Sequence, residues 1–109
     1  MDVNIDCYYY IKEVEDKNHK KYNVFCIKNI PLNEKIIKEM EKYSIVEFAD
    51  NFNQSLCDNL PSKIKEIIFG NKFNHSLDNL PIGLKCLTLS KNYDKPLNNL
   101  RTSVKIIRK

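Results

Sequence analysis

The chain has 109 residues, of which 42% are hydrophobic and 29% charged, with only two glycines and four prolines. This composition favours one compact domain or one short array of repeats, and it excludes a disordered tail and a fibrous chain. The formal net charge of +4 comes entirely from residues 101–109, because residues 1–100 carry as many acidic as basic side chains. A charge gathered at one end is not the basic stripe of a nucleic-acid module, so nucleic acid is not the expected partner.

No apolar run approaches the roughly 18 residues of a membrane span, and residues 1–6 are acidic where a signal peptide would be basic. We therefore expect no membrane partner and an intracellular, cytoplasmic protein. The cysteines at positions 7, 26, 57 and 86 form no Cys-x-x-Cys pair. This spacing predicts reduced thiols in the core rather than a disulfide framework or a metal site.

The N-terminal part, residues 1–44, predicts a β-hairpin followed by a helix. The β-rich stretches 5–14 and 22–27 flank a charged connection, which is typical of two antiparallel strands. Asn33 is a residue type that caps helices, and it predicts a helix over 33–43. The apolar face of that helix would carry Ile36, Ile37 and Met40.

This N-terminal part also resembles one more turn of the array that follows it. Val24 and Val46 are 22 residues apart, which is close to the later repeat length. We interpret strand 22–27 and the helix as a divergent first repeat. Strand 5–14 would then be an antiparallel edge that caps the open end of the array.

The remaining part, residues 45–109, predicts about three repeats of 20 to 22 residues. The segments 46–56, 67–77 and 87–97 align, and each joins two alternating apolar residues, a polar turn, an aromatic residue and a leucine. Such a period predicts a solenoid with one short parallel strand per repeat. The expected inward strand residues are Val46, Phe48, Ile67, Phe69, Leu87 and Leu89. The aromatics that turn back into the core are Phe52, Phe73 and Tyr93. Behind them we expect a wall of six leucines, at positions 56, 60, 77, 80, 97 and 100.

A truncated fourth strand is expected at the C-terminus. Val104 and Ile107 lie 20 residues after Leu84 and Leu87, so they fit the start of another repeat. An unprotected last strand invites self-association through this C-terminal edge, and the charges of residues 105–109 would discourage it.

The strand spacing Leu84-x-x-Leu87-x-Leu89-x-x-Asn92 follows the leucine-rich-repeat pattern. More specifically, the run Phe73-Asn-His-Ser-Leu-Asp-Asn-Leu-Pro81, with the strand that follows it, resembles the FNIP repeat of amoebae and of giant viruses that infect them. The resemblance covers about residues 43–107. It implies an interaction protein with an α/β fold, a leucine-rich-repeat-like parallel β-solenoid with an N-terminal β-hairpin and helix cap. Some members carry an N-terminal F-box that would recruit a ubiquitin ligase, but residues 1–44 lack three amphipathic helices, so we expect a short member without an F-box.

Catalytic chemistry has little support in the sequence. His19 lies in the hairpin connection, and His75 occupies the repeat position that Gln54 and Lys95 hold elsewhere, as a solvated loop residue would. Gly70-Asn-Lys72 lacks the remaining residues of a phosphate loop. The sequence predicts no catalytic residue, no cofactor and no metal ligand, and hence a protein that is not an enzyme.

The partner surface is expected on the exposed face of the parallel strands, where the side chains between the inward ones point. These residues are Ile45, Glu47, Ala49, Glu66, Ile68, Gly70, Cys86, Thr88 and Ser90, with Ile106 after them. A face that is partly apolar and mildly acidic suits a protein or peptide better than a phosphate backbone. An alternative interpretation is that these residues only satisfy β-propensity.

The sequence therefore favours a non-catalytic protein-protein interaction module. Two other functions stay open. The chain could be a shortened relic of a longer repeat array, in the lineage of ubiquitin-ligase substrate adaptors, or it could bind nucleic acid through residues 101–109.

Overall fold

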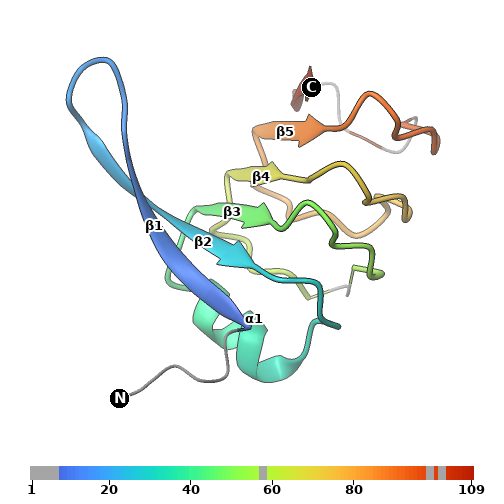
Figure 1. The fold of residues 1–109 in the computed structure, drawn as a ribbon, viewed down its shortest axis with the longest axis horizontal. Helices are drawn as coiled ribbons and strands as arrows, with labels where there is room; N and C mark the ends of the chain where they lie inside the picture. The colour runs from blue at the N-terminus through green and yellow to red at the C-terminus, as the bar shows by residue number, and fades with distance from the viewer. Residues whose placement is uncertain (1–7, 57–58, 98–99, 101–102) are drawn as a thin grey trace.

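The structure is a computed structural model and describes residues 8–56, 59–97, 100 and 103–109. It contains one mixed six-stranded sheet, in which an N-terminal antiparallel hairpin is followed by a parallel β-solenoid of about four turns, with one short helix (Figure 1). The strands lie side by side in chain order. The elements are β1 (Tyr9–Glu15), β2 (Lys21–Ile27), α1 (Glu34–Met40), β3 (Ile45–Phe48), β4 (Glu66–Ile68), β5 (Cys86–Leu89) and β6 (Lys105–Arg108). The predicted fold class is confirmed.

The hairpin forms the N-terminal edge of the sheet. β1 and β2 pair antiparallel from Tyr9↔Ile27 to Glu15↔Lys21, and β2 continues the sheet in parallel with β3. Asp16 stabilises the turn, because its carboxylate accepts hydrogen bonds from the backbone of residues 18 and 20. Residues 5–7 of the predicted first strand lie outside the described residues, and the strand extends one residue beyond the predicted end at 14.

Helix α1 begins where the sequence predicts it and ends earlier. The Asn33 side chain accepts a hydrogen bond of 2.9 Å from the Ile36 amide, as a capping residue should. Met40 and both isoleucines of the helix are buried. The predicted end at residue 43 was wrong: after Met40 the chain makes tighter turns, with hydrogen bonds from the amides of residues 42 and 43 to the carbonyls three residues earlier.

The core lies between the sheet and the return segments. All six predicted inward strand residues are at most 3% exposed, and the three aromatics that follow them are equally buried. The rings stack from one turn to the next, with centroids 4.9 Å apart for Phe48 and Phe69 and 5.9 Å apart for Phe73 and Tyr93. The leucines at 60 and 77 are buried, and those at 56, 80, 97 and 100 are partly buried against the same cluster. The aromatic turn-back and the leucine wall are confirmed.

Two register predictions were wrong, each by one residue. Phe25, not Val24, pairs with Val46, and Ile106, not Ile107, pairs with Leu87. The cause is that the repeats differ in length. Paired inward residues are separated by 21 residues between β3 and β4, by 20 between β4 and β5 and by 19 between β5 and β6. One residue more or less moves a side chain to the opposite face, so Ile106 packs against the core and not on the exposed face.

Asparagine side chains connect neighbouring turns at the carboxyl ends of the strands. Asn29 accepts a hydrogen bond from the Asn53 amide at 3.1 Å, and Asn53 accepts one from the Asn74 amide at 3.0 Å. Each side chain thus satisfies a backbone donor that a non-helical return segment leaves unpaired.

Candidate functional site

The nine residues of the expected partner surface come together on one face of the sheet. The strand register places Ile45, Glu66 and Cys86 side by side across β3, β4 and β5. A second row consists of Glu47, Ile68 and Thr88. The remaining three, Ala49, Gly70 and Ser90, follow the ends of these strands.

Their accessibility is not equal. Seven of the nine are half-buried, whereas Thr88 is 2% and Ser90 7% exposed. The Ser90 hydroxyl donates to the Asn71 side chain at 3.0 Å and accepts from the Asn92 amide at 3.0 Å. Ser90 and Thr88 therefore offer little surface to a partner, and the accessible part of the face lies over β3 and β4.

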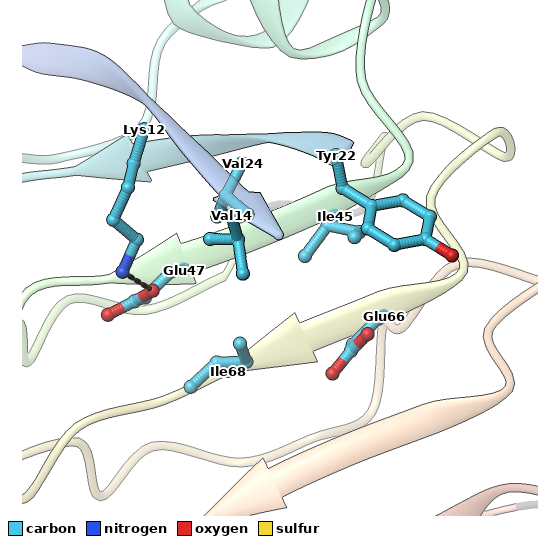
Figure 2. Close-up of a pocket in the computed structure, with 8 residues that line it drawn as sticks. All are labelled: Lys12, Val14, Tyr22, Val24, Ile45, Glu47, Glu66 and Ile68. Carbon is cyan, nitrogen blue, oxygen red and sulfur yellow. Dashed lines mark hydrogen bonds and ion pairs between the residues drawn. The ribbon is translucent and has the colours of Figure 1, made fainter. Parts of the chain in front are cut away.

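A groove of about 540 Å³ occupies that accessible part, between the hairpin and the sheet. Because sheets twist, the hairpin crosses the parallel strands at an angle and its turn projects beyond them (Figure 1). Side chains of β1 and β2 consequently overhang the face of β3 and β4 (Figure 2). The lining residues are Lys12, Val14, Tyr22, Val24, Ile45, Glu47, Glu66 and Ile68.

The four hairpin residues of this groove were missed by the sequence analysis, which treated the hairpin only as a cap. A signal was present, because Lys12 and Val14 alternate along one strand, as do Tyr22 and Val24 along the other. The register confirms that they share a face, since Lys12 pairs with Val24 and Val14 pairs with Tyr22. Sequence alternation could have identified that face, but only the curvature of the sheet brings it over β3 and β4.

One ion pair closes an end of the groove. Lys12 Nζ on β1 lies 2.7 Å from Glu47 Oε1 on β3 (Figure 2). The hydrogen bond to Glu47 raises the pKa of Lys12 above its ordinary value. This pair holds the hairpin over the sheet face and neutralises one of the two groove carboxylates.

Two cysteine thiols lie on the same face. Cys26 and Cys86 are free, and burial raises the pKa of each thiol above its ordinary value. Cys26 pairs in register with Glu47, and Cys86 with Glu66. A raised thiol pKa lowers the thiolate fraction at neutral pH, so both side chains act as small apolar groups here. Cys7 and Cys57 lie outside the described residues.

A smaller polar hollow of about 200 Å³ lies at the carboxyl ends of the strands, lined partly by Gly70, Ser90 and Lys109. Gly70 is required there by close packing, because a Cβ on it would lie 2.5 Å from the Asp50 Cα. The Asp50 carboxylate accepts a hydrogen bond of 2.8 Å from the Asn71 amide. The polar atoms of this hollow therefore serve the turns themselves.

The two histidines lie in separate places. His19 is at the hairpin turn with φ 65°, and its Nδ1 is 2.8 Å from a Glu15 carboxylate oxygen. His75 is half-buried, and its Nε2 is 3.0 Å from the Asn53 carbonyl oxygen. Within the described ranges, no group of three or more His, Cys, Asp or Glu side chains is placed to hold a metal ion.

The basic C-terminal residues are partly used by the fold. Arg108 Nη1 donates to the carbonyl oxygens of Ser90 and Tyr93, both at 2.9 Å. Lys105 and Lys109 are exposed, and Arg101 lies outside the described residues.

The part of the chain that the structure describes contains no helix with the length and apolar character needed to cross a bilayer. In comparisons with family models and with curated proteins, nothing matches this chain.

Proposed function

We propose that this protein is a non-catalytic interaction module of the FNIP-repeat type that binds a protein partner in the groove between its hairpin and β3–β4. The observation that supports it is the groove itself, which lies on the face where a solenoid presents its partner surface. Its volume of about 540 Å³ falls within the range of roughly 300–1,000 Å³ that is typical of binding pockets.

The residues that line the groove favour a peptide segment of the partner as the part that binds there. Four aliphatic side chains form the middle of the groove and polar groups stand at its two ends (Figure 2). An apolar centre with a polar rim is the usual anatomy of a protein-protein contact. The open sides of the groove would admit a chain that continues in both directions.

Selection from random seven-residue peptides displayed on phage tests this function. We expect the wild-type protein to enrich specific peptides and the variant Ile68→Arg to lose them, because a long cation would fill the groove. Ile11→Arg is the matched control, since Ile11 is 42% exposed and belongs to the opposite face of the hairpin. Far-ultraviolet circular dichroism checks that each variant is folded.

The proposal is wrong if no peptide depends on Ile68, or if Ile11→Arg and Ile68→Arg lose binding equally. A catalytic role would require turnover of a substrate, and loss of that turnover in His75→Ala would replace this proposal with an enzymatic one.

Self-association is a second candidate, favoured by the position of β6. This strand pairs with β5 on one side and forms the edge of the sheet on the other. Its exposed residues Lys105 and Arg108 are of the kind that discourages edge pairing. A shortened relic of a longer array would associate through this edge.

Sedimentation velocity over a wide range of protein concentration tests the second candidate. If the edge pairs, the variant Lys105→Thr should sediment as a larger species than wild type, because it removes a charge from the edge. Lys91→Thr, in an exposed turn, is the control. A monomer at every concentration for all three proteins would exclude it.

A further inference from the structure

The groove carries one charge that the protein leaves unbalanced. Glu47 is neutralised by Lys12 at 2.7 Å. Glu66 has no such partner, because none of the basic side chains in the described ranges is within ion-pair distance of its carboxylate. The charged groups of the groove thus sum to one negative charge, on a protein whose formal net charge is +4.

The free carboxylate lies at the end opposite the ion pair. Figure 2 shows Tyr22 and Glu66 at one end and the Lys12–Glu47 pair at the other, with the aliphatic side chains between them. Glu66 and Ile68 are two residues apart on β4, so their side chains point to the same face about 7 Å apart. An extended peptide has the same spacing between residues i and i+2.

Covering this groove has a cost that depends on the partner. Glu66 is half-buried already, and an occupant would remove more water from its carboxylate. Desolvation of a carboxylate is unfavourable unless an opposite charge or hydrogen-bond donors replace the water. An occupant with apolar groups alone would leave this cost uncompensated, and an acidic one would add repulsion.

We propose, on the basis of the function proposed above, that the partner presents an extended segment with a lysine or arginine two residues from an aliphatic or aromatic residue. The basic side chain pairs with Glu66, and the apolar side chain packs over Ile45 and Ile68. The net positive charge of the whole protein does not prevent this contact, because charges beyond about 8 Å are largely screened at physiological ionic strength.

The same phage-displayed peptides test this specificity when their sequences are read. We expect the peptides that depend on Ile68 to share Lys or Arg two positions from Leu, Ile, Val or Phe, in either order. A synthetic copy of one such peptide should bind Glu66→Gln about five- to tenfold more weakly by fluorescence anisotropy. Glu66→Lys should select acidic residues in place of basic ones.

Glu13→Lys is the control, because Glu13 is exposed and lies on the opposite face of the hairpin from Lys12 and Val14. It carries the same charge change and should leave the selected motif unaltered. Peptides that require Ile68 but show no basic residue, or that bind Glu66→Gln as tightly as wild type, would refute this inference and leave the interaction function intact. Failure to enrich any peptide that depends on Ile68 would refute both.

Discussion

Tyr93 is the one tyrosine at a repeat position that phenylalanine holds in the two preceding repeats. It occupies the position of Phe52 and Phe73, is only 3% exposed, and stacks on the Phe73 ring at an interplanar angle of 3°. Unlike phenylalanine it carries a hydroxyl, which donates to the His75 carbonyl at 2.9 Å. Burial raises the pKa of this phenol above its ordinary value of 10.0.

Tyr93→Phe should lower the free energy of unfolding by about 1 kcal/mol at pH 7, because it removes one hydrogen bond and keeps the stacked ring. The difference from wild type should shrink above pH 10. A raised folded-state pKa gives stability that is complete below the unfolded pKa and is lost as the pH rises through the folded one. Urea titrations from pH 7 to pH 11 check this, and a constant difference over that range would contradict it.

Gly70 is a second position where one side-chain atom affects the stability of the fold. The added Cβ of Gly70→Ala would lie 2.5 Å from the backbone of Asp50, so the two turns would have to separate. We expect a loss of about 1–3 kcal/mol, which exceeds the gain of roughly 0.4–1 kcal/mol from a less flexible unfolded chain.

Gly83→Ala is the matched control for Gly70→Ala. Its Cβ would meet the end of the Lys65 side chain at 2.6 Å, which can move aside, and the Ser62 carbonyl oxygen at 3.0 Å. This backbone contact is less close than the 2.5 Å approach to Asp50 at Gly70, so we expect a smaller loss. Thermal unfolding of both variants measures the contrast. An equal loss of stability in both variants would show that the close approach of the two turns at Gly70 does not cause the destabilisation.

At the scale of elements, β6 ends the sheet and is held partly by its own side chain. Arg108 bends back and donates to two carbonyls of the preceding turn, Ser90 and Tyr93. The Ser90 carbonyl also accepts a hydrogen bond from the Tyr93 amide of its own turn, as the Ala49 carbonyl does from the Phe52 amide. Arg108 therefore adds a side-chain contact that fastens β6 to the preceding turn.

Arg108→Ala should loosen β6 before the rest of the sheet. We expect a loss of about 1 kcal/mol and faster hydrogen exchange at the Lys109 amide, which donates to the Leu89 carbonyl. Lys105→Ala on the same strand is the control, since Lys105 is exposed and its backbone bond to Lys85 is independent of its side chain. Exchange rates that are equal in the two variants would show that the Arg108 side chain does not hold β6 in place.

At the scale of the whole molecule, one apolar core connects the helix and the solenoid. The buried cluster runs from Phe25 and Ile36 near one end to Val104 at the other. Each turn packs on its neighbours, as in repeat proteins whose stability depends on contacts between adjacent repeats. The first and last turns are therefore linked indirectly, through the aliphatic core. Among the described residues the ring contacts form two groups, one around Phe25 and one from Phe48 to Tyr93.

Such a core in a short array should unfold in one step. A urea titration followed by circular dichroism and by tyrosine fluorescence should give coincident transitions, with a slope of about 1–2 kcal/mol/M. Two separate transitions, one of them assigned to α1 and the hairpin, would show that the N-terminal elements and the later repeats are only loosely coupled.

The sequence by itself determined the solenoid and its inward face. Alternation of apolar residues such as Ile67 and Phe69, and an aromatic at each turn, leave one arrangement that buries them all. The Asn33 cap could also be predicted from the sequence, because its hydrogen bond joins residues only three positions apart.

Only the tertiary structure decided the register of the outer strands and the shape of the site. Paired strand residues are 19 to 21 positions apart, so Val24 and Ile106 lie on the face of the sheet opposite to the predicted one. A shift of one residue moves a side chain to the other face of a strand. The twist that carries Lys12 over Glu47 is a property of the whole sheet, and it creates the groove. It also determines that Glu66 is the groove carboxylate without an ion-pair partner among the residues that the structure describes.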